Sequence, residues 1–306
     1  MIDIVIVNWN GRAYCEDLLP QILEHWKDSV GKVVVVDNDS KDGSQDAIAK
    51  HFPWVTLVCL PQNVGYAKGN NAGIALCNSP IVLLLNNDTK IIDPYYLHKI
   101  SSRFQENSKL AVWGGKLILK NGRFQTGAAG FDRGLLSFFT YFLFLSRLFP
   151  ESSAPFYIDQ KAFSKRTNLI YVDWISGASM AVNRKTLLEI GGVPEDYFMY
   201  AEDIKLCRSV REKGLSIAYD PTASIVHFHG GSETTLDTKT RWIDSTLSEY
   251  SRDRGSVKRT LAKLIFGVGF ALRAAIYKLL SMISPQKESL SASYKRMVIY
   301  MKAALR

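Results

Sequence analysis

The sequence predicts an α/β protein built on a doubly wound, mostly parallel central sheet. Short, nearly continuous apolar runs rich in β-branched residues recur in the first third of the chain, as in strands buried on both faces. Helical segments alternate with these runs, and this order predicts parallel strands joined by right-handed crossovers. Polar, partly acidic residues follow three of the runs directly. They would gather at the edge of the sheet where ligands bind in such folds.

The four N-terminal strands are expected at Ile2–Val7, Val33–Val36, Val55–Leu60 and Ile81–Leu85. Helices are expected over Tyr14–Trp26, after Asp42-Gly43-Ser44, over Ala67–Leu76 and from Asp93-Pro94 onward. The last of these would begin with Asp93 as its N-cap and Pro94 at its first position, a combination that favours a helix start.

The pattern changes to mixed strands and turns from Val112 onward. Helices are expected over Asn183–Glu189 and Glu202–Lys213, each followed by glycine, and short strands at Ser216–Tyr219 and Ala223–Val226. After about Thr238 the chain looks helical and amphipathic. We therefore expect one domain over residues 1–237, with halves at 1–110 and 111–237, and a basic helical region over 238–306.

The formal net charge of +9 is concentrated at the C-terminal end, because residues 239–306 hold 14 Lys and Arg against 4 Asp and Glu. A basic region of this kind can meet an anionic membrane, nucleic acid or a phosphorylated substrate, or can be a solvated helical face. The membrane is favoured over nucleic acid, and no nucleic-acid partner is expected. Leu135–Leu145 and Lys258–Met282 mix apolar residues with a few cations, so a membrane contact and a core or homodimer interface both stay open.

The cysteines at positions 15, 59, 77 and 207 lack the paired spacing of a zinc or redox site, and we expect reduced, mostly buried thiols of a cytosolic protein. The N-terminus is expected to be a strand and not a signal peptide. Uncharged apolar runs such as Gly134–Ser146 and Leu264–Leu272 fall short of the ~20 residues that span a bilayer, so no spanning helix is expected.

Three strand ends carry the first candidate site residues: Asn8, then Asp37 and Asp39, then Asn86-Asn87-Asp88. A carboxylate at the second end can accept hydrogen bonds from a ribose or a base edge, although Asp39 could instead cap the following helix. Asp88 could bind a hard divalent cation that also contacts phosphate oxygens. The alternative is an ordinary polar turn, since Asn and Asp favour turns in any case.

The segment Asn63–Asn71 opens the third helix with free amide N–H groups, the side chain of Lys68 and several side-chain amides. These groups suit a diphosphate or a base edge, and the alternative is a simple glycine turn.

Glu202 and Asp203 open a later helix, where a carboxylate either serves as a general base or stabilises the helix dipole. His227 and His229 alternate on a strand end and point the same way, so that one of them could complete a metal site with Asp88. A histidine ligand slightly favours Mn²⁺ over Mg²⁺.

Taken together, these segments resemble the family 2 glycosyltransferases with the GT-A fold, and the subgroup looks like the rhamnosyltransferase-like enzymes of bacterial surface polysaccharide synthesis. The matching stretches follow the family's order over roughly residues 1–235: Ile4–Gly11, Val34–Gly43, Asn63–Gly73, Leu83–Asp88, Trp174–Asn183, Gly191–Asp203 and Val226–Ser232.

The resemblance implies residue roles. A nucleoside-diphosphate sugar would bind in the half formed by residues 1–110, and the acceptor in the half formed by 111–237. Donor-binding residues would be Asn8, Asp37, Asp39, Asn63, Lys68, Asn87 and Asp88. Asp88 and His227 would hold a divalent metal, Mn²⁺ or Mg²⁺, with His229 the less favoured ligand. Asp203 would be the catalytic base, and Trp174, Gly177 and Glu202 would line the acceptor side. Two departures, Lys205 where the family often has Asp and Ser209 where it often has Arg, concern the acceptor pocket.

The implied reaction is an inverting single displacement onto a hydroxyl of a saccharide or a lipid-linked saccharide, in the cytoplasm or on the inner face of the cytoplasmic membrane. Two alternatives stay open. A sugar nucleotidyltransferase also uses a doubly wound sheet and a metal, but the glycine-rich basic loop expected after the first strand is missing from the sequence. A catalytically inactive nucleotide-sugar-binding scaffold is compatible with the single carboxylate of Asn86-Asn87-Asp88.

Overall fold

The computed structural model describes residues 1–132, 134–149, 153–228, 236–252 and 254–306. The chain forms two compact units. The first combines Met1–Gly130 with Asp159–Ser232, and the second combines Phe131–Ile158 with Glu233–Arg306. The segment from Phe131 to Ile158, which lies inside the expected domain of residues 1–237, therefore packs with the C-terminal helices.

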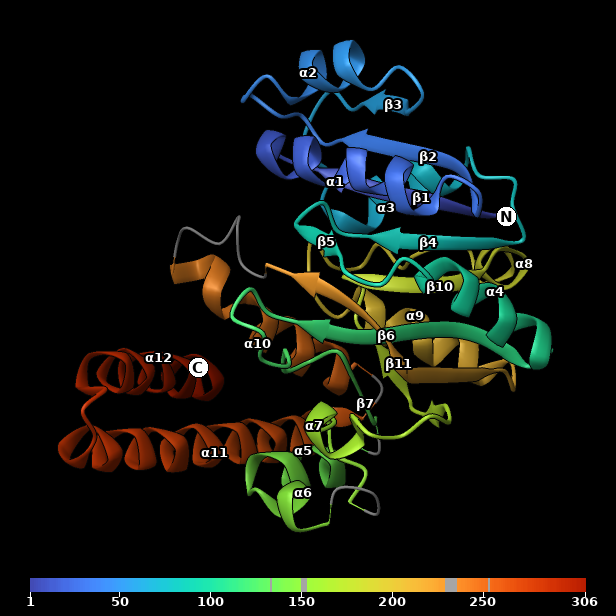
Figure 1. The fold of residues 1–306 in the computed structure, drawn as a ribbon. Coiled ribbons are helices and arrows are strands. Elements are labelled where there is room, and N and C mark those ends of the chain that lie inside the picture. The colour runs from blue at the N-terminus through green and yellow to red at the C-terminus, as the bar shows by residue number, and fades with distance from the viewer. Residues whose placement is uncertain (133, 150–152, 229–235, 253) are drawn as a thin grey trace. The chain divides into compact units, whose positions relative to one another are not determined.

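The N-terminal part of the first unit has the predicted parallel strands. β1 (Ile2–Asn8), β2 (Val30–Asp37), β3 (Thr56–Cys59) and β4 (Ile81–Leu85) lie in the order β3-β2-β1-β4 (Figure 1). The intervening helices are α1 (Arg12–Trp26), α2 (Ser44–His51) and α3 (Tyr66–Ile74). β1 and β4 are buried along nearly their whole length, which explains why their sequences are continuously apolar.

Beyond β4 the sheet becomes mixed. β10 (Ser179–Asn183) runs antiparallel to both β4 and β6 (Leu110–Ile118), and β11 (Ser216–His227) runs parallel to β6. β5 (Thr89–Ile91) and β8 (Ile170–Tyr171) pair antiparallel with β11, and β7 (Ala129–Gly130) pairs with β9 (Trp174–Ile175). The helices of this part are α4 (Tyr96–Glu106), α7 (Gln160–Phe163), α8 (Arg184–Glu189) and α9 (Glu202–Glu212). The expectation of a mostly parallel α/β sheet is confirmed, with antiparallel strands on this side.

Two local predictions are wrong. The helix expected from Asp93-Pro94 begins at Tyr96, because Asp93 Oδ1 accepts a hydrogen bond from Tyr95 N (3.1 Å) in a turn that precedes the helix. The two strands expected at Ser216–Tyr219 and Ala223–Val226 are one strand, β11, whose pairing with β6 shifts register between Asp220 and Ser224.

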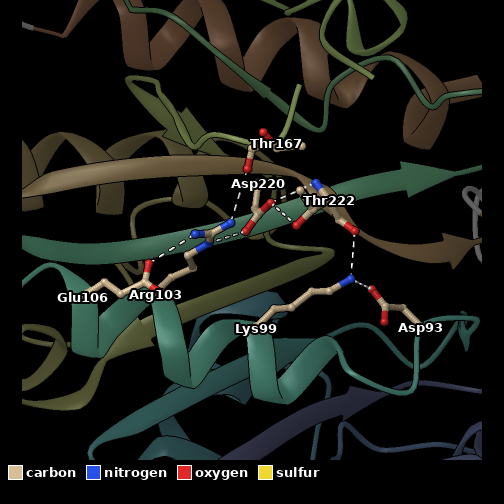
Figure 2. Close-up of polar contacts among 7 residues, drawn as sticks. All are labelled: Asp93, Lys99, Arg103, Glu106, Thr167, Asp220 and Thr222. Carbon is tan, nitrogen blue, oxygen red and sulfur yellow. Dashed lines mark hydrogen bonds and ion pairs between the residues drawn. The ribbon is translucent and has the colours of Figure 1, made fainter. Parts of the chain in front are cut away.

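A polar network ties α4 to this shifted part of β11 (Figure 2). Arg103 Nε donates to the fully buried carboxylate of Asp220 (2.9 Å), whose other oxygen accepts from the backbone N and hydroxyl of Thr222 (2.9 and 2.6 Å). Lys99 Nζ donates to Thr222 O (2.9 Å) and to Asp93 Oδ2 (2.7 Å). These contacts fix the part of β11 that leads to His227.

The second unit consists of helices. They are α5 (Leu135–Phe142), α6 (Leu145–Leu148), α10 (Leu236–Ser251), α11 (Gly255–Ile283) and α12 (Lys287–Leu305). α11 and α12 lie side by side as an antiparallel pair (Figure 1). The core of this unit is aromatic: Phe266 is in ring contact with Phe138, Phe142 and Phe270, and Phe142 also contacts Phe270. In the part of the chain that the structure describes, α11 is the one helix long and apolar enough to cross a membrane by length and composition. The uncharged apolar runs of the sequence predict no such helix.

Candidate active site

The polar strand ends meet at one edge of the sheet. Asn8 at the end of β1 donates from Nδ2 to Asp37 Oδ2 at the end of β2 (2.8 Å), and it accepts from Asn87 Nδ2 beyond β4 (2.8 Å). Asp37 is fully buried, and its other oxygen accepts from Ser40 N (2.9 Å) and Gln45 Nε2 (2.7 Å). Parallel pairing in register brings these residues together, and hydrogen bonds then fix their side chains.

Asp39 lies beside this cluster with a different environment. Its backbone is left-handed (φ 66°), its carboxylate forms an ion pair with Lys41, and its side chain is 28% exposed. Asp39 is therefore more accessible to a ligand than Asp37, whose oxygens are occupied by protein donors.

Asn38, which the sequence did not single out, connects the second strand end to the segment that opens α3. Its Nδ2 donates to Asn63 Oδ1 (2.9 Å) and Gly65 O (3.1 Å), and its Oδ1 accepts from Val64 N (2.9 Å). Lys68 is exposed in the first turn of α3. Asn63 thus lies next to the end of β2, and Lys68 lies in the helix that follows it.

Asp88 and His227 are brought together by backbone pairing. Phe228 N donates to Asp88 O (2.8 Å), and β11 pairs with β5 so that His227 lies opposite Thr89. As a result His227 Nε2 lies 3.1 Å from Asp88 Oδ1 and 3.2 Å from Asn86 Nδ2. His227 Nδ1 lies 2.7 Å from Oε1 of Gln125, a second residue that sequence reasoning missed.

This pair of side chains fits a divalent cation in part. Two ligands about 3 Å apart suit neighbouring positions of an octahedral ion with bonds of about 2.1 Å, and a carboxylate with an imidazole is a donor set that Mn²⁺ accepts. Among the described residues, no group of three His, Cys, Asp or Glu side chains could hold a metal. The remaining positions would fall to phosphate oxygens and water, as is usual for Mg²⁺-like sites. His229 lies outside the described residues.

Asp203 lies in the first turn of α9, next to the strand ends. Its Oδ2 accepts from Gly177 N (3.1 Å), and Gly177 O accepts from the hydroxyl of Tyr66 in α3 (2.7 Å). The neighbouring Ala178 O accepts from Asn86 N (3.0 Å), which joins this segment to the end of β4. Gly177 therefore lies between the Asn86-Asn87-Asp88 tip and Asp203.

The turn before α9 has an unusual backbone. Tyr200 and Ala201 both have left-handed φ angles (71° and 74°), although neither residue is a glycine. Such conformations cost of order 1–3 kcal/mol each and concentrate at functional sites. This turn aims the first residues of α9, Glu202 and Asp203, at the segment around Gly177.

The pKa of the Tyr66 phenol is affected by three carboxylates of the candidate site. Burial raises the pKa of Tyr66, and the negative charges of Glu202, Asp203 and Asp88 raise it further. Burial, followed by the charge of Asp203, raises the pKa of Glu202 to about 8. Burial also raises the pKa of Asp203, against the effect of the amide of Gly177, which favours its ionised form. Glu202 is thus mostly neutral near pH 7, and the amide of Gly177 favours the ionised form of Asp203.

Two other residues expected on the acceptor side are buried, and Lys205 is bound in an ion pair. Trp174 in β9 is buried, as is Glu202. Lys205, which stands where the resembling family often has Asp, forms an ion pair with Asp196.

A family model described as "Glycosyltransferase like family 2" matches residues 2–245. The chain belongs to this family. The family expected from the sequence motifs is thereby confirmed, and with it the expectation of a glycosyltransferase. Among relatives, the chain is 23% identical to the low-salt glycan biosynthesis hexosyltransferase Agl10 of Haloferax volcanii, over 93% of this chain and 88% of the relative. It is 32% identical to the rhamnosyltransferase WbbL of Escherichia coli over 27% of this chain and 32% of WbbL.

Solved glycosyltransferases share the fold. The mannosyltransferase PcManGT of Pyrobaculum calidifontis, solved in complex with GDP-Man and Mn²⁺, superimposes with a TM-score of 0.62 at 15% identity and covers 99% of this chain and 86% of its own. GalNAc-T7, solved with UDP, GalNAc and Mn²⁺, gives a TM-score of 0.58 at 12% identity, over 97% of this chain and 56% of that chain. These structures confirm the GT-A fold of the family 2 glycosyltransferase described here.

Proposed function

We propose that this glycosyltransferase is an inverting, metal-dependent enzyme that moves a sugar from a nucleoside diphosphate to a hydroxyl of a saccharide or lipid-linked saccharide. The proposal assigns it to cell-surface polysaccharide synthesis. One observation carries it: Asp203 is held by the amide of Gly177, and Gly177 is joined through Ala178 to the Asn86-Asn87-Asp88 tip. A carboxylate held by a backbone amide thus lies next to the strand end proposed to hold the donor's diphosphate.

The donor's nucleoside is assigned to the ends of β1 and β2. Asp39 and Asn63 offer oxygen acceptors for ribose hydroxyls or a base edge, while Asn8 and Asp37 shape this part of the site through their mutual hydrogen bond. Lys68, exposed in the first turn of α3, is assigned to the diphosphate, together with the neighbouring backbone N–H groups. Asn87 holds the β4 tip to β1 and so supports the same site.

Asp88 and His227 are assigned as ligands of Mn²⁺ or Mg²⁺. A cation bound there would neutralise negative charge on the leaving diphosphate. The two side chains are fixed before any ligand arrives, because the backbone pairing of β11 with β5 sets their spacing. Mn²⁺ in the related structures is consistent with this assignment.

Asp203 is assigned as the base that takes the proton of the acceptor hydroxyl as this oxygen attacks the anomeric carbon from the side opposite the diphosphate. Glu202 is neutral near pH 7, and the hydrogen bond from Gly177 N favours the ionised form of Asp203. Trp174 and Gly177 belong to the segment that walls this side of the site, with Gly177 the residue that orients Asp203.

Rhamnose is our proposal for the transferred sugar, because the relatives include WbbL and an N-acetylglucosaminyl-diphospho-decaprenol L-rhamnosyltransferase of Mycobacterium tuberculosis. The latter is 38% identical over 66 residues, 22% of this chain and 21% of the relative. A lipid-linked acceptor fits the basic region 238–306, which we place in peripheral contact with the inner face of the cytoplasmic membrane.

The experiment that tests the donor site is a thermal-shift screen with Mn²⁺ and UDP, dTDP or GDP. A ligand that binds only the folded protein raises Tm, and a rise of several degrees that needs both metal and one nucleotide is expected. The absence of any shift would favour the inactive scaffold. Product analysis separates the second alternative, since a glycosyltransferase releases nucleoside diphosphate and a nucleotidyltransferase releases pyrophosphate.

The base is tested by Asp203→Asn. We expect kcat to fall by 10² to 10⁴-fold while the Mn²⁺-dependent Tm shift with the nucleotide persists. Near-wild-type turnover by this variant would refute the assignment. A loss of the Tm shift as well would show that the substitution damages the donor site.

A further inference from the structure

A stripe of exposed apolar side chains runs along α11 in the second unit. The stripe consists of Leu261, Leu264, Val268, Leu272, Ile276 and Leu279, each 42–65% exposed. Their spacing of three or four residues places them on one face of the helix. The opposite face, with Phe266 and Phe270, is buried in the aromatic core of the unit.

Exposed apolar side chains are concentrated in the second unit. The second unit holds one third of the residues, but it carries 15 of the 25 large hydrophobic side chains found exposed among the described residues. Monomeric soluble proteins rarely leave contiguous apolar surface of this kind in water, so the stripe calls for an occupant.

The positive charge of α11 indicates which kind of partner would cover the apolar stripe. α11 contains Lys258, Arg259, Lys263, Arg273 and Lys278, and its sequence has no Asp or Glu. A second copy of the chain would bring the same positive charges together, which is unfavourable. An anionic phospholipid surface complements both the charge and the apolar stripe.

The packing of α11 against α5 and α12 limits the orientation in which this helix can contact a bilayer. Arg273 donates to Phe142 O (2.8 Å), Tyr141 O (3.1 Å) and Gly269 O (3.1 Å), so the middle of the helix is bonded to α5. α12 packs along α11 as well. A helix covered by protein on one side cannot be surrounded by lipid, although its length alone would let it cross a bilayer.

We propose that the stripe on α11 is a membrane-docking surface that lies in the plane of an anionic phospholipid bilayer. Docking keeps the enzyme at the surface where a lipid-linked acceptor resides. The proposal itself depends only on the second unit and stands apart from the chemistry assigned to the first.

Flotation of the full-length protein with vesicles tests this surface. We expect binding to phosphatidylglycerol-containing vesicles, little binding to pure phosphatidylcholine, and release by high salt. The triple variant Leu264→Gln/Leu272→Gln/Leu279→Gln should partition at least about tenfold less, since each Leu loses its burial in the lipid. These side chains are exposed in water, so the variant should fold normally.

The matched control is Leu23→Gln/Leu76→Gln/Leu188→Gln, which removes three exposed leucines from the first unit. It should float like wild type. Equal flotation of both triple variants, or no binding of wild type to anionic vesicles, would overturn the proposal. Retention through an alkaline carbonate wash would show a spanning helix instead. A dimer in sedimentation that the stripe variant dissociates would assign the stripe to a second copy.

A second inference concerns Gln125, and it rests on the proposed metal site. The carbonyl oxygen Oε1 of Gln125 can only accept, and it lies 2.7 Å from His227 Nδ1. That nitrogen must therefore carry a proton, so Nε2 is the ring nitrogen available to a cation, 3.1 Å from Asp88 Oδ1 and 3.2 Å from Asn86 Nδ2. Both Gln125 and His227 are buried.

Gln125 is itself held in place. Its backbone N donates to Leu117 O (2.9 Å), and its backbone O accepts from Gln160 Nε2. Gln160 has a fixed orientation because its Oε1 accepts from Leu117 N (3.1 Å) and from the hydroxyl of Tyr219 (3.0 Å). The backbone of Gln125 is thus fixed beside the imidazole by hydrogen bonds on both sides of the residue.

The geometry points to Gln125 as a positioning residue that keeps His227 in the tautomer able to bind a cation with Asp88. Outer-shell partners of this type commonly change metal affinity by 10–100-fold. We expect Gln125→Leu to weaken Mn²⁺ binding by a factor in that range, and Gln125→Glu, which keeps an acceptor oxygen, to retain it. Binding is measured by electron paramagnetic resonance of free Mn²⁺ in the presence of UDP, dTDP or GDP.

Two outcomes separate this inference from the proposed function. If wild type binds Mn²⁺ and Gln125→Leu binds it equally well, Gln125 has no positioning role. If wild type does not bind Mn²⁺, the metal site itself is wrong. Imidazole ¹⁵N chemical shifts of His227 in metal-free protein give an independent measurement, and an Nε2–H tautomer in wild type would overturn the assignment.

Discussion

Removing Arg103 should destabilise the first unit by about 2–4 kcal/mol. Asp220 is fully buried, and Arg103 Nε is its cationic partner at 2.9 Å (Figure 2). Breaking a buried ion pair from one side costs about 3–5 kcal/mol, since the other charge is left without compensation. We place Arg103→Leu toward the lower end, because the arginine is 25% exposed and Asp220 keeps two hydrogen bonds from Thr222.

Urea unfolding followed by tryptophan fluorescence measures this change. Five of the six tryptophans lie in the first unit, so the signal reports mainly its unfolding. The control is Glu106→Ala, which removes the 60% exposed partner of the same arginine (3.2 Å) and should cost at most about 0.5 kcal/mol. A loss below about 1 kcal/mol for Arg103→Leu, or equal losses in the two variants, would refute the idea that the buried pair holds β11 in its shifted register.

Three further predictions follow from the site and the core. Burial raises the pKa of Glu202 from its ordinary value of 4.5 to about 8, so the stability of the wild type should fall as pH rises between these values, by up to about 1.4 kcal/mol per pH unit. Glu202→Gln should lose this dependence in urea titrations at several pH values. Gly65→Ala should lower Tm by several degrees and weaken nucleotide binding, because its Cβ would lie 2.5 Å from Phe198 O at a φ of 87°. Thiol titration of native protein should modify Cys59 rapidly and the three buried cysteines only after unfolding; rapid reaction of a second thiol would contradict the burial.

The sheet could be predicted because its signals are local. Strands buried on both faces need apolar residues at every position, so β1 and β4 are recognisable from a few residues each. The polar residues after them are equally visible, and since β1, β2 and β4 are parallel neighbours, their ends must meet. Asn8, Asp37 and Asn87 do meet, through hydrogen bonds of 2.8 Å.

The failures have non-local causes. Asp93-Pro94 has the local signature of a helix start, but the carboxylate of Asp93 accepts hydrogen bonds from Tyr95 N and from Lys99 Nζ of the following helix. The register shift in β11 begins at Asp220, whose partner Arg103 is far away in sequence. Gln125 lies in a segment of ordinary composition, and only the fold shows that its oxygen faces His227. A sequence pattern contains no signal for such pairs.

The carboxylate pair at the start of α9 bears on the choice between an enzyme and an inactive scaffold. Burial raises the pKa of both Glu202 and Asp203, so the folded state disfavours their ionisation and loses stability near neutral pH relative to uncharged residues. The strained φ angles of Tyr200 and Ala201 add to this cost. A scaffold that only binds a nucleotide sugar at the strand ends gains nothing from a buried base, whereas a base with a raised pKa is what proton transfer requires. The acid limb of the kcat–pH profile should therefore lie above the ordinary aspartate pKa of 3.8.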